Sequence, residues 1–534
     1  MRDIFNVNTA FISKNGFKNF DEFLVDISKF ANIDKDSQIE IFTQDSYLFL
    51  VAFFGALLSK STPYLLPHNL PSNSREFFND ENITNIINSS NKSNNINIKL
   101  DLNSVFYIQT SGSSGERKNI KKTINQMVIE GEFLHKYFNL NSSHIVLSSV
   151  SHQHLFGLTF KIFTSLISGS KIHVETLNYP ELLKEKLSNY NQNSNILLIS
   201  SPVLLESISK QNSIDEFDKI QMIFSAGSKL HLDIQNNLTN KLKTKIVEIY
   251  GSSETGVIAY NLDGDFTIFP GVNTKTDNES RLIISSPWQN CVGGFLSNDC
   301  VQINGNSLKI IGRYDRIIKL HDRRISLDGI ENLIKQSPFI NNVAISQDES
   351  HKRLAAILVL SDEGKKLYKT KGKNGIVDQI KLLIKDEYGN KLRYFYIRSS
   401  LPINQQGKIS KNDFINSINS KIEPEFKLIQ KESNSIKLTA YIDEGSFYFN
   451  GHFLNFPLVP GFIQLGFVFN SAIKYLGLKY ENLSDIETIK FINFLRPCDI
   501  ATLNIQILDN KLYFTLYAND KECANGRLKI AQWI

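Results

Sequence analysis

The stretch that decides the fold class is Gln109–Lys118, with the sequence QTSGSSGERK. It follows Leu102–Ile108, an apolar run that predicts a buried strand. Glycines let a backbone approach a ligand closely, while free backbone N–H groups, hydroxyls and a lysine such as Lys118 can surround phosphate oxygens. A flexible Ser/Gly linker is the alternative, but a linker seldom follows directly on an apolar strand. The stretch therefore predicts a phosphate-binding loop, with a spacing different from that of the nucleotide-binding P-loop.

Composition narrows the class of protein. A chain of 534 residues, 41% hydrophobic and 21% charged, predicts several soluble domains. The net charge of +5 and the lack of a basic block interleaved with aromatic residues argue against a nucleic-acid partner. The cysteines form no Cys-x-x-Cys pair, which favours reduced thiols over disulfides or zinc. The longest apolar run, Tyr47–Leu58, is shorter than the ~20 residues that span a bilayer, and with no signal peptide we expect a cytoplasmic protein.

The loop at 109–118 closely resembles the phosphate-binding loop of the adenylate-forming superfamily, which includes acyl-CoA synthetases, aryl-CoA ligases, luciferases and peptide-synthetase adenylation domains. Arg117 stands where that family usually has proline. The resemblance implies an α/β enzyme with a large AMP-binding domain, residues 1–312, and a small mobile subdomain, residues 313–420. The nucleotide-binding residues that it implies in the loop are Thr110, Ser111, Gly112, Ser113, Ser114, Gly115 and Lys118.

A second motif, Ile246–Gly256, resembles the family's Tyr-Gly-x-Thr/Ser-Glu-x-Gly. The resemblance implies that Tyr250 and Gly251 flank adenine and that Thr255 binds the α-phosphate. It implies that Glu254 holds Mg²⁺, an ion that prefers hard oxygen ligands and bridges phosphates. The motif therefore implies ATP and Mg²⁺ as cofactors.

Three further motifs follow in family order. Asp299 ends a Leu-Ser-Asn-Asp stretch that is similar to the family's Thr-Gly-Asp, and the resemblance implies a bond to the ribose hydroxyls. In Gly312–Lys319, Arg313 would bind ribose or phosphate oxygens and Asp315 would be the hinge of the small subdomain. Lys408, in Leu401–Ile409, aligns with the catalytic lysine that stabilises charge developing between carboxylate and phosphate.

The acyl pocket is implied by two weaker similarities. His154 and Gly157 match a family His-x-x-Gly segment that lines and gates the pocket. Ser225, Ala226 and Gly227 resemble a family loop that borders the acyl group and adenine. Asp322 replaces a glycine in the loop that serves the thioester step, a change that bears on thioester formation rather than on adenylation.

Residues 421–534 form a different kind of domain. A largely apolar helix at Phe462–Leu476 and a hairpin at 501–517 predict a central helix wrapped by an antiparallel sheet, the hotdog arrangement. The segment 447–461 resembles the hydroxyacyl carrier-protein dehydratases, and His452 aligns with their catalytic histidine. Gly466 stands where those enzymes carry an acidic residue, although dehydration needs both an acid and a base. Two interpretations stay open: a dehydratase with altered chemistry, or a non-catalytic acyl or carrier-protein docking and dimerisation module.

Together the resemblances imply ATP-dependent activation of a carboxylic acid to an acyl-adenylate, followed by transfer to a phosphopantetheine thiol. The hotdog domain favours an acyl carrier protein over free CoA, an aryl or fatty acid as substrate in an aryl-polyene-like or fatty-acid-like pathway, and a homodimer. The alternative is a lyase or acyl-binding module with a degenerate ligase half. The sequence selects neither the acyl chain nor the thiol.

Overall fold

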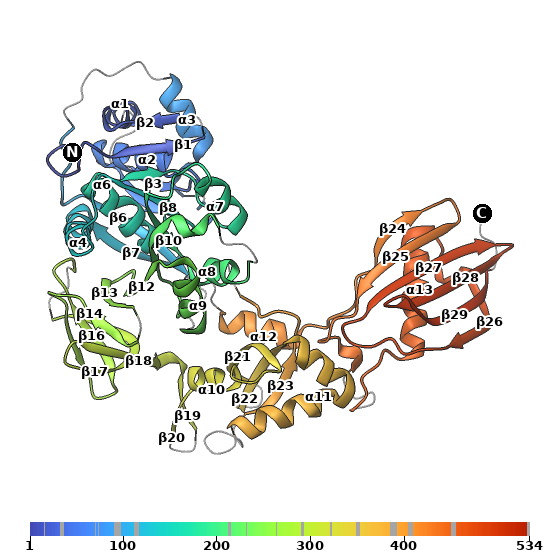
Figure 1. Cartoon of the computed structure of the whole chain (residues 1–534). Helices are drawn as coiled ribbons and strands as arrows, with labels where there is room; N and C mark the ends of the chain where they lie inside the picture. Colours follow the sequence, from blue (N-terminus) through green and yellow to red (C-terminus); the bar gives the residue numbers. More distant parts are fainter. Residues whose placement is uncertain are drawn as a thin grey trace. The chain divides into compact units, whose positions relative to one another are not determined.

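A computed structural model describes residues 1–14, 16–31, 37–69, 71–72, 74–89, 98–111, 117–211, 215–230, 232–262, 264–289, 293–320, 323–348, 353–384, 392–403, 409–449 and 455–530. The chain divides into two compact units, Met1–Tyr314 and Asp315–Ile534 (Figure 1). Within the described residues no helix is long and apolar enough to cross a membrane.

One sheet of the first unit has five strands and packs against a largely buried helix. Asp45 caps this helix, α2 (Ser46–Leu58), by accepting hydrogen bonds from the N–H groups of Tyr47 and Leu48. Because α2 is apolar on all sides, it packs in the interior, as its sequence predicts. The sheet order is β5 (Glu76–Phe78), β3 (Gln38–Ile41), β4 (Thr62–Leu65), β6 (Val105–Ser111) and β7 (Arg117–Thr123), with α1 (Phe20–Phe30) and α3 (Asp80–Ser89) beside α2.

The second sheet of this unit has thirteen strands, and its middle is parallel. Strands β8, β10, β11 and β12 lie side by side and run in one direction, as expected of an open α/β sheet. In sheet order the strands are β15 (Asn273–Thr276), β16 (Arg281–Ser285), β17 (Phe295–Asn304), β18 (Ser307–Arg313), β14 (Phe266–Ile268), β13 (Gly256–Asn261), β12 (Lys245–Ser252), β11 (Ile220–Ser225), β10 (Asn195–Ser200), β8 (His144–Ser148), β9 (Lys171–His173), β1 (Ala10–Ser13) and β2 (Gly16–Lys18). The helices between them are α4 (Ile124–Tyr137), α5 (Leu155–Gly157), the π-helix η1 (Leu158–Phe163), α6 (Thr164–Ser168), α7 (Pro180–Leu187), α8 (Pro202–Ser209) and α9 (Leu232–Leu242).

The bounds of two elements differ from those that the sequence predicts. The apolar residues of Asn195–Leu205 predict one strand, but the strand ends at Ser200, because Pro202 takes the first position of α8, where its fixed φ suits a helix. The segment 377–388 predicts a helix, and its described part lies in the second of two helical segments of α11 (Asp362–Ile384), which meet at Gly372, where φ is 62°. Residues 385–388 lie outside the described residues.

The described part of the second unit contains a two-stranded hairpin and two larger sheets. The first, β21 (Ile340–Asp348), β22 (Arg353–Leu360) and β23 (Leu392–Ile397), packs with α10 (Leu327–Ile334), α11 and α12 (Lys411–Asn419), after the hairpin of β19 (Ile317–Leu320) and β20 (Arg323–Ser326). The second is antiparallel, in the order β24 (Lys427–Lys431), β25 (Ser435–Tyr441), β27 (Ile500–Leu508), β28 (Lys511–Ala518), β29 (Lys521–Ile530) and β26 (Leu483–Phe491).

The helix α13 (Gly461–Leu476) lies along this six-stranded sheet, which is the predicted hotdog arrangement (Figure 1). Its buried residues join the inward side chains of β25, β27 and β28 in one core. The predicted hairpin is present, and Asp509 and Asn510 make its two-residue turn with φ of 49° and 55°. Positive φ at both central residues is what a type I′ turn requires.

Candidate functional site

Three of the predicted segments meet at one edge of the thirteen-stranded sheet. His154 follows the carboxyl end of β8, Ser225 ends β11, and Tyr250 lies near the end of β12. With β10 these strands are parallel neighbours, so their carboxyl ends lie at the same edge. Open α/β sheets bind ligands at that edge. The structure therefore brings the predicted acyl-pocket and nucleotide segments together.

The nucleotide segment is a tight antiparallel turn between β12 and β13. Gly251 pairs with Val257, and a Cβ atom on Gly251 would lie 2.4 Å from the carbonyl oxygen of Gly256. Gly256 adopts a φ of 73°, which favours glycine. Thr255 is fully buried, and its hydroxyl donates to the carbonyl of Gly256 at 3.0 Å. Its contact with the α-phosphate stays a prediction.

A hydrogen bond joins two residues predicted to bind adenine and ribose. The hydroxyl of Tyr250 donates to Oδ2 of Asp299 at 2.6 Å, and the Ser297 hydroxyl donates to the same oxygen at 3.2 Å. Arg313 lies opposite Asp299 in the β17–β18 register. Burial, reinforced by the Asp299 carboxylate, raises the pKa of Tyr250, so the phenol stays protonated and remains a donor. The three predicted residues thus lie together.

The predicted phosphate loop connects β6 to β7, which form an antiparallel hairpin. Thr110 pairs with Lys118, and Ser111 pairs with Arg117, at the end of the two strands. Lys118 is exposed. Gly112, Ser113, Ser114 and Gly115 lie outside the described residues.

The predicted acyl segment is held rigidly at its start. Gln153 donates to and accepts from the backbone of Thr43, at 2.9 and 3.1 Å. Gly157 is required sterically, because a Cβ there would lie 2.1 Å from the carbonyl oxygen of Ser151. His154 immediately precedes α5, which continues into the π-helix η1, a feature frequent at functional sites.

The loop after β11 turns sharply beside this segment. Ser225 is buried, Ala226 is half-buried, and Gly227 is exposed with a φ of 103°. That φ lies in the region that favours glycine, so the loop can turn away from the sheet here. The roles of all three residues in acyl binding stay predictions.

Sequence reasoning missed three residues that support the nucleotide turn. Lys122 on β7 donates to the carbonyl oxygen of Glu254 at 3.3 Å, and Gln126 donates to the carbonyl of Trp288 at 3.2 Å. Glu130 accepts from the N–H of Val257 at 2.6 Å. The signal was a regular spacing of four residues directly after the phosphate loop, which places Gln126 and Glu130 on one face of α4.

Several predicted residues are not at this edge or are not described. Lys408, Asp322 and His452 lie outside the described residues. Asp315, the predicted hinge, is the first residue of the second unit. Gly466 lies on α13, and a Cβ atom added there meets nothing within 4 Å.

The carboxylate of Glu254 fits the predicted role of a magnesium ligand. Its half-buried carboxylate is a hard oxygen ligand, and in the described part of the chain no cluster of three His, Cys, Asp or Glu side chains forms an all-protein metal site. Mg²⁺ at nucleotide sites is commonly held by one or two carboxylates plus phosphate oxygens and water. Glu254 would hold the ion, and the positive charge of the ion would offset the negative charge of the phosphates.

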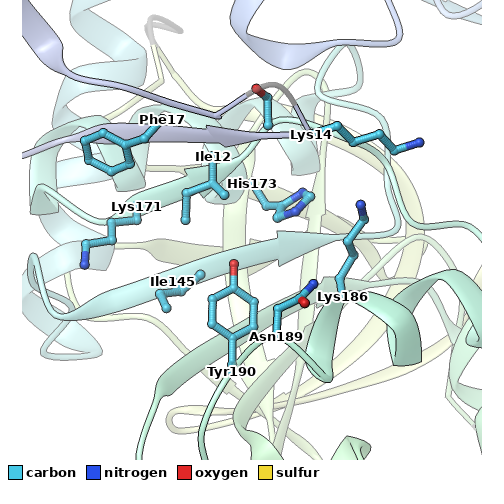
Figure 2. A pocket seen from close by; sticks show the side chains of 10 residues that line it. Ile12, Lys14, Phe17, Ile145, Lys171, His173, Lys186, Asn189 and Tyr190 are labelled. Atoms are coloured by element: carbon cyan, nitrogen blue, oxygen red, sulfur yellow. The ribbon is translucent and has the colours of Figure 1, made fainter.

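A pocket of about 590 Å³ lies elsewhere in the first unit, as Figure 2 shows. Lys14, Lys186 and His173 point toward it, and Ile145 and Lys171 line it from the amino ends of β8 and β9. Lys14 and Lys186 form ion pairs with Glu175 at 3.4 and 2.9 Å, which offset part of their charge. Since the predicted nucleotide residues lie at the opposite ends of the parallel strands, we assign this pocket no part in nucleotide binding.

Two family models match the chain. Residues 73–284 match the AMP-binding enzyme family, and residues 428–527 match the ApeI-like family, described as ApeI dehydratase.

Relatives and solved structures agree with the first match. A putative long chain fatty acid-CoA ligase VraA of Staphylococcus aureus (strain COL) is 25% identical over 211 residues, which cover 35% of this chain and 45% of that protein. The chain thus spans about half the length of that relative. A D-alanine–D-alanyl carrier protein ligase of Bacillus licheniformis is 22% identical over 57% of this chain and 69% of its own.

A likeness of fold extends over a longer part of the chain. The structure of O-succinylbenzoate coenzyme A synthetase from Bacillus subtilis, in complex with ATP and magnesium ion, is 15% identical, with a TM-score of 0.63 over 76% of this chain and 96% of that one. The fold class predicted from the sequence is therefore confirmed: the chain carries an α/β region of the AMP-binding enzyme type followed by an ApeI-like hotdog domain.

Proposed function

We propose that the protein activates a carboxylic acid with ATP. The observation that carries the proposal is the hydrogen bond between Tyr250 and Asp299, opposite Arg313 and at the sheet edge that also holds the predicted acyl segment. A carboxylate oxygen of the substrate attacks the α-phosphorus, the bond to the β-phosphate breaks, and pyrophosphate leaves. In this proposal Tyr250, Asp299 and Arg313 hold adenosine, and Thr255, Lys118 and the phosphate loop hold the phosphates.

We further propose that the acyl group passes to the phosphopantetheine thiol of an acyl carrier protein. The thiolate attacks the acyl carbonyl and AMP leaves. Two similarities support a carrier over CoA: the likeness to a D-alanyl carrier protein ligase and the ApeI-like match at 428–527. We propose an aryl or a fatty acid as the substrate, and the likeness to a putative long chain fatty acid-CoA ligase supports the fatty acid.

The experiment that tests activation is ATP–pyrophosphate exchange across a panel of aryl and fatty acids, followed by transfer from the best acid to CoA and to a holo acyl carrier protein. We expect exchange with one class of acid and faster transfer to the carrier. If no acid supports exchange while calorimetry shows that Mg-ATP binds, the protein is a nucleotide-binding relative without the ligase reaction. The lyase or acyl-binding alternative then becomes the better explanation.

The hotdog domain has two candidate functions, dehydration of a 3-hydroxyacyl thioester and docking of the acyl carrier protein. Docking is favoured by Gly466, since glycine has no group that can transfer a proton. The position is open, so a carboxylate would fit there without a clash within 4 Å of its Cβ.

A substitution at Gly466 separates these two functions. If the domain docks the carrier protein, the wild type should dehydrate the substrate only slowly. We then expect Gly466→Asp to raise the dehydration rate at least about 10-fold, because general acid catalysis typically contributes 10²–10⁴-fold. His452→Ala in that background should remove the gain, and Gly466→Ala is the control for volume. The measurement is enoyl thioester formation from a 3-hydroxyacyl carrier protein. A fully active wild type that His452→Ala inactivates would establish the dehydratase instead.

We also propose a homodimer that forms through β26. This strand is one edge of the six-stranded sheet, with β29 as its neighbour, and Ile486, Phe491, Ile492 and Phe494 are 51–60% exposed. Bare edge strands with apolar side chains pair readily with other chains. The opposite edge, β24, is shorter and carries Lys427 and Lys431, and lysines discourage such pairing.

Light scattering tests this interface. The wild type should have twice the monomer mass of 60.8 kDa, and Ile486→Asp with Ile492→Asp should reduce it to 60.8 kDa. The matched control is Ile429→Asp on β24, because Ile429 and Ile486 are both 56% exposed. A monomeric wild type, or dissociation by Ile429→Asp, would show that β26 is not the interface.

A further inference from the structure

Three polar side chains spaced four residues apart begin just after the phosphate loop: Lys122, Gln126 and Glu130. Lys122 and Glu130 are each only 2% exposed. Burying a lysine and a glutamate costs several kcal/mol unless they are paired and hydrogen-bonded. The bonds that offset this cost therefore indicate what the two residues do.

Those bonds converge on the turn that carries Glu254. The ammonium of Lys122 donates to the carbonyl oxygen of Glu254 itself, at 3.3 Å. Three residues further on, the N–H of Val257 donates to Glu130 at 2.6 Å, and the carbonyl of Val257 accepts from the indole of Trp288 at 3.1 Å. Gln126 holds Trp288 in turn. These hydrogen bonds thus hold the Glu254–Val257 turn at both of its ends.

The opposite charges of Lys122 and Glu130 stabilise each other. Burial lowers the pKa of Lys122, while Glu130 and Glu254 oppose that shift. Burial raises the pKa of Glu130, and Lys122 opposes it. When Lys122 is charged, its positive charge lies beside the backbone of Glu254, the residue predicted to hold Mg²⁺.

The carboxylate of Glu130 also contacts the predicted acyl-pocket segment. Its second oxygen accepts from the hydroxyl of Thr159 at 3.1 Å, on the π-helix η1 that follows His154 and Gly157. One carboxylate therefore binds the nucleotide turn and the element beside the acyl pocket.

We propose that Lys122 and Glu130 are positioning residues that set the Glu254–Val257 turn for binding of Mg²⁺ and nucleotide. This inference rests on the proposed ATP-dependent activation. Lys122 fixes the backbone of Glu254, and with it the direction of the carboxylate. Glu130 fixes Val257 through hydrogen bonds and keeps η1 in contact with the turn.

The first test is Lys122→Met, which keeps the apolar stem and removes the ammonium. We expect Mg-ATP to bind about 5- to 10-fold more weakly by calorimetry and the Mg²⁺ concentration for half-maximal exchange to rise, while KM for the acid changes less than two-fold. The matched control is Lys121→Met, because Lys121 is the exposed neighbour on the same strand. Calorimetry needs no acid, so the inference can be tested even if exchange is not found with any acid.

The second test compares two substitutions of Glu130. Glutamine can accept from the N–H of Val257 with its oxygen and donate to the hydroxyl of Thr159 with its NH₂ group, whereas leucine can do neither. We expect Glu130→Leu to raise KM for Mg-ATP about 10-fold or more and Glu130→Gln to recover it to within about 3-fold. Thermal melting of each variant reports folding separately.

Two results would overturn the proposal. One is unchanged Mg-ATP binding and Mg²⁺ dependence in Lys122→Met, which would make the lysine a structural residue alone. The other is an equal loss of affinity for ATP and for the acid in Lys122→Met and Glu130→Gln, which would indicate general loosening of the unit. A wild type that binds Mg-ATP but exchanges with no acid contradicts the activation reaction and leaves the binding test of the inference in force.

Discussion

Replacing Lys408 with alanine is expected to slow ATP–pyrophosphate exchange by ~10²–10³-fold. The physical reason is that a group which stabilises charge only in the transition state contributes about 3–4 kcal/mol to the barrier. Since ground-state binding uses other groups, the Kd of Mg-ATP should change little. Exchange kinetics and calorimetry on the same samples measure the two effects separately.

The matched control for this substitution is Lys366→Ala, an exposed lysine on α11 of the same subdomain. It should exchange like the wild type. Full activity of Lys408→Ala would mean that the ligase mechanism assigned to Leu401–Ile409 is wrong. Loss of ATP binding along with exchange would instead make Lys408 a nucleotide-binding residue.

Replacing Gly256 with alanine is expected to reduce both exchange and Mg-ATP binding by ~100-fold or more. A Cβ atom there would lie 2.4 Å from Oε1 of Glu130 and 2.6 Å from Cδ1 of Trp288, both buried. In addition, a φ of 73° costs an alanine about 1–2 kcal/mol. Because neither neighbour has room to withdraw, the turn must shift, and a displacement of about 1 Å in a site can cost 10²-fold.

The control is Gly264→Ala, eight residues along the chain. A Cβ at Gly264 meets nothing within 4 Å, so this variant should bind Mg-ATP and exchange like the wild type. Circular dichroism and melting temperature show whether Gly256→Ala keeps its fold. A folded Gly256→Ala with normal nucleotide affinity would show that the turn does not set the site.

Local sequence patterns determined much of the fold. The apolar run Tyr47–Leu58 indicates the buried helix, and the strict alternation around Asp509-Asn510 indicates the hairpin at 501–517. Both depend on interactions within a few residues of the chain. Where two local preferences competed, prediction failed: the apolar run after Asn195 hid the helix start at Pro202.

The candidate site was predicted residue by residue, but not as an arrangement. Motif spacing singled out Tyr250, Asp299 and Arg313 separately. Only the tertiary structure places the Tyr250 hydroxyl on Asp299, because β12 and β17 are separated by β13, β14 and β18 in the sheet. No pattern local to either strand encodes that contact.

Lys122 and Glu130, which hold the Glu254–Val257 turn, show most clearly what the sequence alone could not predict. Lysine and glutamate side chains usually face solvent, so the sequence alone predicts that Lys122 and Glu130 are exposed. The sequence by itself determined that they follow a phosphate loop and lie eight residues apart, with Gln126 midway between them. Only the fold decided that they are buried, since β7 and α4 bring them to the Glu254–Val257 turn, more than 120 residues further along the chain, as in Glu130 with Val257 at a separation of 127. Burial then makes their hydrogen bonds strong and their loss costly, because no water can replace the missing partner.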